Sequence, residues 1–304
     1  MKHNCLTVLV WVLFATLTAT AQQDPQYTQY AYNLSVVNPA YAGTQGTLSF
    51  ALLYRKQWSG IEGAPSTITF SGNSPVGEKS GIGVSFIRDR LGPVQESNVY
   101  ADYSYTLNLD EYTFLSLGIK AGLTFHEVGL ANLGLTQEGD PLFAENIGNN
   151  YPNIGAGAYY YNRVFYAGLS VPNFLRSVHL DANGIRYGAE VNHFFFVTGF
   201  IYPVNENFTL KPSFLFKTAF GAPLSVDINM ITELYERFQV GFSYRLHDSF
   251  SGLVGFRLNE RLRIGYAHDR VISDLRFQGR ASHEAVITYD LEYKLKRVLP
   301  VRFN

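Results

Sequence analysis

The chain has 304 residues and a formal net charge of −1, with 46% hydrophobic residues and 16% charged residues, against about 25% charged residues in typical soluble domains. The near-zero charge argues against a nucleic-acid-binding protein, which needs a basic surface, and the aromatic content of 15% excludes a disordered chain. The single cysteine, Cys5, allows no disulfide framework.

The first residues have the pattern of a secretory signal peptide. Lys2 and His3 give a short basic start, an apolar run follows over residues 6–17, and the sequence Ala-Thr-Ala ends at Ala21. This apolar run is too short to span a bilayer, which takes about 20 residues of helix. We therefore expect a signal peptide over residues 1–21, cleaved between Ala21 and Gln22, and an exported mature chain.

The next segment, residues 22–44, lacks the periodicity of a strand and is rich in aromatic and amide side chains. It suits either a plug that packs inside or beneath the folded remainder of the chain, or a peptide that docks onto a partner. We favour the plug because packing is the commoner use of such side chains. The residues expected to carry either role are Asp24, Pro25, Gln26, Tyr27, Gln29, Tyr30, Asn38, Pro39 and Tyr41.

From residue 46 onward, apolar and polar residues alternate with the period of a β-strand. The clearest example runs from Leu115 to His126, which is long enough to cross a bilayer as a tilted strand of about 9–11 residues. About fourteen such segments are expected, an even number as in single-chain bacterial barrels. They are residues 46–56, 65–73, 80–90, 97–109, 112–126, 153–162, 164–171, 186–201, 207–218, 222–232, 237–246, 249–258, 261–270 and 283–295.

The two longest breaks between these segments are residues 127–152 and 172–184. Each is too long for a tight turn, so we expect an outward loop or a plug. The shorter breaks carry turn-forming residues, such as Asn205 and Asn207.

The character of the two strand faces distinguishes a soluble sandwich from a membrane barrel. In a barrel the apolar face meets lipid and the polar face lines the interior. The polar face here is mostly Gly, Ser and Thr, which suits a crowded interior better than a solvated surface. Aromatic residues at 159–161, 194–196 and Tyr202 are expected to form girdles at the membrane interfaces. The sequence predicts an all-β, transmembrane antiparallel β-barrel of about 14 strands over residues 22–304, with a soluble all-β protein as the alternative.

Charged residues on the polar face are expected to point inward. Paired charges would satisfy a filled interior, whereas a charged channel for solutes is the alternative, and the mixture of signs favours pairing. The inward residues are predicted to be Arg55, Lys120, Lys211, Lys217, Arg245, Arg257, Asp102, Asp227, Glu284, Asp290 and Glu292.

Catalytic and metal-binding patterns are weak. His247, Asp248 and Ser249 are the residue types of a hydrolase triad, but adjacent residues on a turn cannot orient one another in series. His268 and Asp269 should face opposite sides of a strand, and His283 and Glu284 likewise. No His or Cys cluster has the spacing of metal ligands. We therefore expect no enzyme activity, no cofactor and no metal site.

A set of short motifs recurs in order along the chain: residues 23–30 (QDPQYTQY), 38–43 (NPAYAG), 54–58 (YRKQW), 63–65 (GAP), 100–103 (YADY), 168–173 (GLSVPN), 210–213 (LKPS), 221–227 (GAPLSVD) and 262–266 (LRIGY). Together they resemble the PorP/SprF family, whose members are outer-membrane proteins of the type IX secretion system and the gliding motility machinery. The resemblance covers essentially the whole mature chain, and the joint pattern is specific although each piece alone is weak.

This resemblance implies an outer-membrane barrel of a Gram-negative bacterium that helps to secrete exported proteins such as adhesins, or to anchor them at the surface. The implied partners are an exported protein with a C-terminal secretion domain, a periplasmic ring, a peptidoglycan-binding lipoprotein and outer-membrane lipid. We expect binding of the C-terminal domain by the loops or the barrel mouth. The alternatives are an assembly component of the secretion ring and a transport channel for small or hydrophobic solutes.

Overall fold

The computed structural model describes residues 30–130, 146–175, 178–182, 185–189, 192–219, 222–272 and 281–291. Three helical turns, η1 (Tyr30–Asn33), α2 (Leu34–Val37) and η2 (Pro39–Tyr41), precede the strands. The strands are β1 (Leu48–Lys56), β2 (Ser66–Val76), β3 (Ser80–Leu91), β4 (Val94–Asn108), β5 (Phe114–Val128), β6 (Ile147–Tyr161), β7 (Phe165–Val171), β8 (Val178–Ala182), β9 (Ile185–Ala189), β10 (His193–Phe200), β11 (Tyr202–Asn205), β12 (Phe208–Ala219), β13 (Ser225–Leu234), β14 (Phe238–Arg245), β15 (Ser249–Arg257), β16 (Leu262–Val271) and β17 (Ser282–Leu291).

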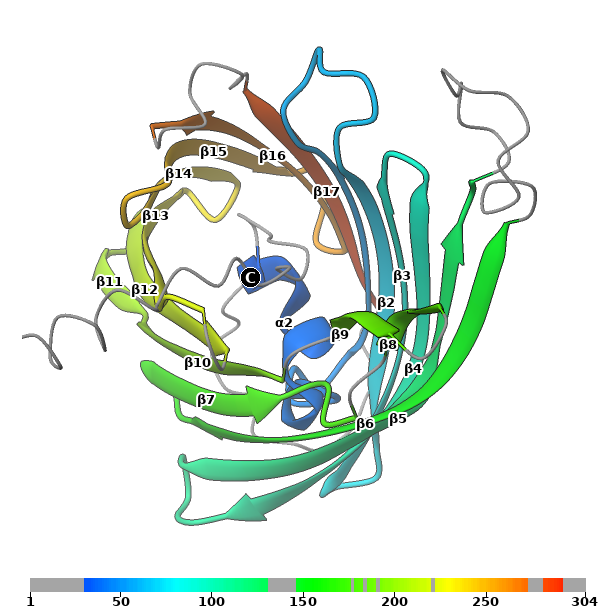
Figure 1. Ribbon diagram of the computed structural model, residues 1–304. Helices are drawn as coiled ribbons and strands as arrows, with labels where there is room; N and C mark the ends of the chain where they lie inside the picture. Colours follow the sequence, from blue (N-terminus) through cyan, green and yellow to red (C-terminus); the bar gives the residue numbers. More distant parts are fainter. Residues whose placement is uncertain are drawn as a thin grey trace, which may run out of the picture.

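Fourteen of the described strands form a closed ring, which Figure 1 shows from one end. Neighbouring strands are antiparallel, and the ring closes where β1 pairs with β17 and β10 pairs with β12. Closure satisfies the backbone groups of each strand on both sides, which a lipid environment requires. The predicted 14-stranded antiparallel barrel is confirmed.

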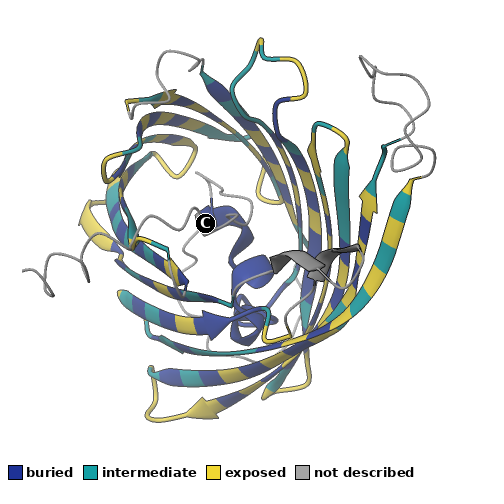
Figure 2. Cartoon of the chain, in the orientation of Figure 1, coloured by how far each residue is buried: buried dark blue, intermediate teal, exposed yellow. Residues whose placement is uncertain are grey.

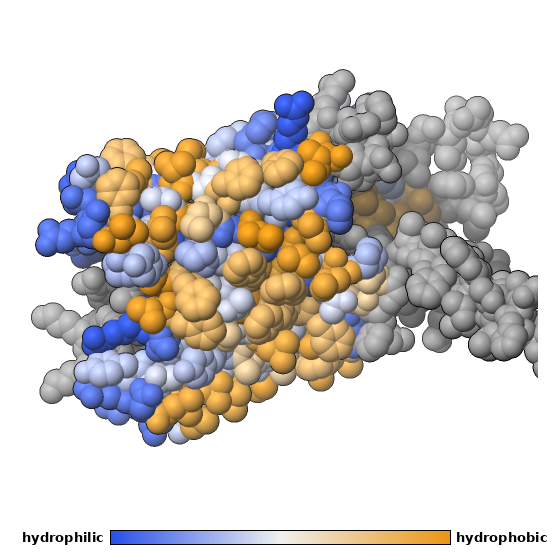
Figure 3. Space-filling model, turned by 90° about the vertical axis from the view of Figure 1, so that its left-hand side faces the viewer, coloured by the Kyte–Doolittle hydropathy of each residue, from blue (hydrophilic) through white to orange (hydrophobic). Residues whose placement is uncertain are grey.

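Exposure alternates along the strands, as the bands of Figure 2 show. On β5, Ile119 is 63% exposed while the next residue, Lys120, is 2% exposed. Outward positions carry residues such as Leu52 and Phe242, and inward positions carry residues such as Thr69 and Ser116. Figure 3 shows hydrophobic side chains across one side of the outer surface. This arrangement, apolar outside and polar inside, is typical of a barrel whose solvent is lipid.

Three boundaries differ from the sequence prediction. The segment expected over residues 186–201 is divided, because β9 pairs with β8 in a separate hairpin and only β10 joins the ring. Apolar residues occupy odd positions from Ile185 to Val191, whereas the exposed apolar residues of β10, Phe196 and Phe200, occupy even positions, so the alternation changes phase at the division. The break expected over residues 127–152 is shorter, since β6 already begins at Ile147 and pairs with β5 along its whole length. The short strand β11 was not expected and extends the edge of β12.

The two rims of the ring differ in the length of their connections. One rim, here called the short-turn rim, carries residues 77–79, 109–113, 162–164, 235–237 and 258–261, together with the paired strand ends Leu48 and Leu291. The opposite rim, here called the long-loop rim, carries the two longest connections between ring strands, residues 129–146 and 172–192. Because bacterial barrels have short periplasmic turns and longer extracellular loops, we assign the short-turn rim to the periplasm.

None of the helices in the described part of the chain has the length and apolar character needed to cross a membrane.

Candidate functional site

Residues 30–47, which precede the first strand, lie inside the ring (Figure 1). This inner segment, residues 30–47, is built from η1, α2, η2 and the turns that follow, and all of its described side chains are buried. Pro39 begins η2, and the side chain of Asn38 caps that turn by accepting a hydrogen bond from Ala40 N at 3.0 Å. A helical segment can enter the ring because its backbone hydrogen bonds are largely local.

Hydrogen bonds hold the backbone of the inner segment to one wall of the barrel. Lys120 Nζ of β5 donates to Val36 O at 2.6 Å, Ser170 Oγ of β7 donates to Val37 O at 2.7 Å, and Ser104 Oγ of β4 donates to Ala42 O at 2.7 Å. On β6, Ala158 O accepts from the amide of Asn38 at 3.1 Å. Inward side chains of β4, β5 and β7 therefore bind carbonyls of one short stretch, and a backbone carbonyl of β6 binds the Asn38 side chain.

Two tyrosines of the inner segment contact the opposite wall. Tyr30 Oη lies 3.2 Å from Ser213 Oγ of β12 and accepts a hydrogen bond from Asn229 Nδ2 of β13 at 2.9 Å. Tyr32 Oη donates to Gln239 Oε1 of β14. Burial raises the pKa of the Tyr32 hydroxyl to about 12, so this hydroxyl remains a neutral donor. The inner segment thus spans the ring from β4–β7 to β12–β14.

Two glycines on the β5–β6 wall permit the close approach of the inner segment. A Cβ at Gly118 would collide with backbone atoms of Pro39 and Ala40, and a Cβ at Gly157 would collide with Asn38 Oδ1. Any other residue at Gly118 would have to displace backbone rather than the tip of a flexible side chain, because the colliding atoms are main-chain atoms. These glycines therefore form part of the wall surface against which the inner segment packs.

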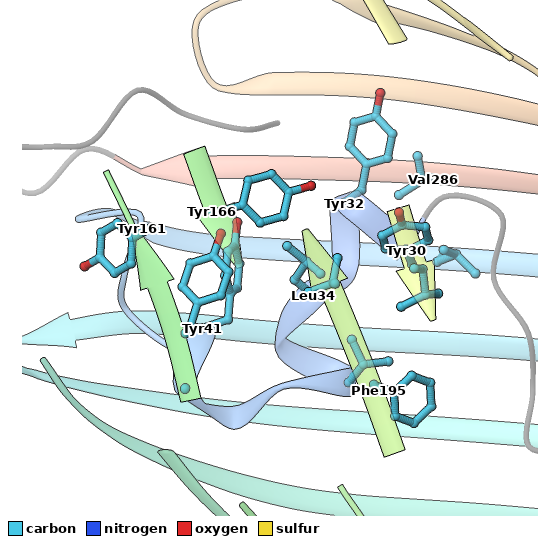
Figure 4. Packing of buried hydrophobic residues seen from close by; sticks show 14 of the residues in the cluster. Tyr30, Tyr32, Leu34, Tyr41, Tyr161, Tyr166, Phe195 and Val286 are labelled. Atoms are coloured by element: carbon cyan, nitrogen blue, oxygen red, sulfur yellow. The ribbon is translucent and has the colours of Figure 1, made fainter. Parts of the chain in front are cut away.

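The aromatic residues expected to form interface girdles divide between the two faces. Tyr159 and Tyr161 are each 1% exposed and Phe195 is 8% exposed, so all three point inward and the girdle prediction is wrong for them. They pack with Tyr30, Leu34 and Tyr41 of the inner segment in one apolar cluster (Figure 4), in which Tyr41 and Tyr159 meet edge to face at 5.4 Å. In a strand with three consecutive aromatic residues, the first and third side chains point to one face and the second points to the other. Composition alone does not indicate which of the two faces meets lipid. Phe196 and Tyr202 are exposed, as the prediction requires.

Eight of the eleven charges predicted to face inward are buried, and seven of these eight form ion pairs with other described residues. Arg55 Nη1 lies 2.7 Å from Asp269 Oδ2 and 3.0 Å from Glu284 Oε2, and all three side chains are buried. The other ion pairs join Lys120 to Asp102, Lys211 to Glu233 and Arg245 to Asp227, while Lys217 lies over the ring of Phe195. Arg257 and Asp290 are partly exposed near the short-turn rim, and Glu292 lies outside the described residues.

The residues proposed from sequence for a plug or docking role fall into two groups. Tyr30, Asn38, Pro39 and Tyr41 are buried in the inner segment and contact the barrel wall. Asp24, Pro25, Gln26, Tyr27 and Gln29 lie outside the described residues, as do the cleavage residues Ala21 and Gln22. The sequence prediction placed Lys120 inside but did not name the other wall residues that contact the segment: Ser104, Gly118, Gly157 and Ser170. Their inward position was readable from strand periodicity, but the chain segment facing them was not.

The histidine pairs lie as strand geometry requires. His268 is exposed on the outer face while Asp269 is buried inside against Arg55, and His283 and Glu284 divide in the same way. The rings of His268 and His283 are neighbours on the outer surface, with centroids 5.0 Å apart. Within the described residues, no three His, Cys, Asp or Glu side chains gather in the way that a metal ion would need.

Substituting Asn38 tests how much the inner segment contributes to stability. We expect Asn38→Ala to lower the free energy of unfolding by about 1–3 kcal/mol, since the change removes the contact to Ala158 and leaves the Ala40 amide without its buried acceptor. Urea unfolding of the barrel in lipid vesicles measures this difference. Asn150→Ala, the same substitution at an exposed position of β6, should change the unfolding free energy by less than about 0.5 kcal/mol. Equal effects of the two substitutions would show that the Asn38 contacts carry no stability.

Comparison with known proteins agrees with the barrel architecture. A family model described as "Type IX secretion system membrane protein PorP/SprF" matches residues 19–289. No curated protein matches the chain. Among solved structures, the chain is similar to the CymD monoaromatic hydrocarbon channel, with 10% identity, a TM-score of 0.51, and coverage of 87% of this chain and 93% of that one.

Two further structures show lower similarity. A FadL homologue of Pseudomonas aeruginosa matches with 13% identity and a TM-score of 0.46 over 88% of this chain and 95% of that one. The outer membrane protein Omp33 of Acinetobacter baumannii matches with 8% identity and a TM-score of 0.48 over 81% and 100% of the two chains. At such identities the likeness to solved structures concerns the fold alone.

Proposed function

Because the chain belongs to the PorP/SprF family of type IX secretion system membrane proteins, we propose that it is a non-enzymatic docking protein of the outer membrane. It binds the C-terminal domain of an exported protein, such as an adhesin, and holds that protein at the cell surface. Its further partners are the periplasmic ring and the peptidoglycan-binding lipoprotein of the same system. Family membership supports the secretion context, and the organisation of the barrel supports docking.

The observation that carries the proposal is the occupied interior. The inner segment is bound by both walls of the ring, through Lys120 and Ser170 on one side and through Ser213 and Gln239 on the other. Four buried cations of the same interior, Arg55, Lys120, Lys211 and Arg245, form ion pairs with interior carboxylates. A solute channel needs an open lumen lined by hydrated groups, and this arrangement favours a binding role over conduction.

The long-loop rim is the surface that suits a partner outside the cell. The two longest connections between ring strands, residues 129–146 and 172–192, leave this rim from neighbouring parts of the ring, after β5 and after β7. Phe174 and Leu175, in the described part of the second connection, are each 41% exposed. Exposed apolar side chains on a connection that a rigid barrel positions are a common basis for protein binding.

Deletion of the gene distinguishes docking from the two alternative roles. We expect one exported protein, or a small set, to move from the cell surface to the medium, while the uptake of small and hydrophobic solutes is unchanged. Mass spectrometry of cell-surface and medium fractions measures the first quantity, and the gene restored on a plasmid serves as the control. Loss of all type IX cargo together would indicate a ring-assembly role, and altered solute uptake with normal anchoring would indicate a channel. Either result contradicts the docking proposal.

A further inference from the structure

A pocket opens at the short-turn rim, between the β13–β14 turn and the β15–β16 turn. Its volume is about 710 Å³, and three arginines line it, Arg237, Arg257 and Arg261, together with Glu236 and Glu260. The inner segment contributes no residue to this lining. The pocket is therefore distinct from the contacts that seat the inner segment.

The arginines of this pocket form few ion pairs with the described part of the chain, although Glu236 and Glu260 also line the pocket. Arg237 and Arg261 form no ion pair with a described residue, and Arg257 Nη2 reaches Glu233 Oε2 only at 4.0 Å. That carboxylate is already engaged, since Glu233 Oε2 accepts from Lys211 Nζ at 3.2 Å and from Gln239 Nε2 at 2.6 Å. Guanidinium donors that lack carboxylate partners in a partly enclosed site favour an oxyanion ligand.

A fourth arginine, Arg263, is the strand neighbour of the pocket residue Arg257. Arg263 on β16 lies opposite Arg257 on β15 in the strand register, and it is only 7% exposed. Its Nη1 atom has no hydrogen-bond partner among the described residues. A buried guanidinium beside a second arginine raises the positive potential of the site and adds to its attraction for an anion.

We propose that this pocket binds an acidic peptide segment of a periplasmic protein, with Asp or Glu carboxylates held by Arg237, Arg257 and Arg261. Arg257 pairs in register with the buried Arg263 and so occupies an inward-facing strand position, away from the surrounding lipid, while Arg261 is exposed in the β15–β16 turn. The inward position of Arg257 suits a peptide rather than a lipid phosphate. Tyr235 and Tyr289, which also line the pocket, supply aromatic contact area for a peptide chain. The inference does not depend on cargo docking, because it concerns the opposite rim.

A binding assay with the full-length protein in nanodiscs of neutral lipid tests this proposal. The probe is a fluorescent Gly/Ser peptide that contains four Asp or Glu residues, and the comparison peptide carries Asn or Gln at the same positions. We expect the acidic peptide to bind on the order of tenfold more tightly, with an affinity that falls as salt rises. The double variant Arg237→Gln/Arg261→Gln should weaken its binding at least about tenfold, given the strength of charge-assisted hydrogen bonds.

The matched control is Arg88→Gln/Arg90→Gln, which removes the same charge from exposed positions of β3 near the long-loop rim. This control should bind the acidic peptide as the unaltered protein does. Equal binding of the two peptides, or an equal loss in both double variants, would overturn the proposal. Displacement of the peptide by anionic lipid vesicles, but not by neutral ones, would assign the pocket to lipid phosphate and would also overturn it.

Discussion

The Gly118→Val variant should conduct ions through a planar bilayer at a level on the order of tenfold above the unaltered protein. Gly118 on β5 lies directly beneath Pro39 and Ala40, and a Cβ there would collide with their backbone atoms. The added side chain therefore forces the inner segment away from the β5–β6 wall. A ring of fourteen strands is wide enough to hold water once its interior is vacated.

The matched control for this prediction is Gly252→Val. Gly252 is an exposed strand glycine on β15, and a Cβ at this position would meet nothing within 4 Å. We expect this control to conduct like the unaltered protein. A heat-modifiable shift on gels verifies that both variants fold, and deletion of residues 30–47 provides a second route to an emptied lumen. If neither the valine nor the deletion raises conductance, the inner segment does not determine whether the barrel is open.

Replacing Arg55 with methionine should destabilise the barrel by about 3–5 kcal/mol, the largest effect on stability that we expect from a single substitution. Arg55 is the shared cation of Asp269 and Glu284, which lie on the adjacent strands β16 and β17. Glu284 is completely buried. Without the guanidinium, two carboxylates remain close together in the interior with their hydration lost, and the folded state bears that cost. Urea unfolding in vesicles measures the difference.

Two further variants test whether unpaired buried charge causes the loss of stability in the Arg55→Met variant. Arg88→Met removes an exposed arginine of β3 whose side chain contacts Gln95, and it should change the free energy of unfolding by less than about 0.5 kcal/mol. Adding Glu284→Gln to the Arg55→Met variant should restore part of the lost stability, because one buried charge is then removed. A cost for Arg55→Met that Glu284→Gln does not reduce would mean that lost packing, not unpaired charge, causes the effect.

Strand periodicity predicted most of the fold because one face of each strand meets lipid. Leu117, Ile119 and Leu123 are all exposed, whereas Ser116, Lys120 and Thr124 are buried, as the alternation requires. Membrane strands keep this contrast along their whole length, so the number of ring strands and the inward charges could be read from the sequence.

The interior contacts could not be predicted in the same way. Tyr159 and Tyr161 resemble girdle residues by composition, yet they point inward because the inner segment provides an apolar surface for them. The close contact between Pro39 and Gly118 joins positions far apart in the sequence, and strand periodicity carries no information on such contacts. Likewise, β9 pairs with β8, which immediately precedes it in the chain, and not with a strand of the ring.

Pairing of the buried charges connects the fold to the proposed function. Most of the buried charges predicted to face inward form ion pairs, and Arg245 and Asp227 do so through two hydrogen bonds of 2.7 Å. Such an interior stabilises a rigid ring rather than a selective pore. A rigid ring with an occupied centre leaves its rims as the surfaces for the partners that we propose, an exported protein at the long-loop rim and an acidic periplasmic segment at the short-turn rim.

The most direct test of the docking proposal is an affinity pull-down of the tagged full-length protein from outer membranes, followed by mass spectrometry. Membranes from a strain that carries the untagged protein serve as the control. We expect recovery of a large exported protein with a C-terminal secretion domain, enriched with the bait. Recovery of ring and lipoprotein components without any exported protein, or of the barrel alone, would contradict the proposal.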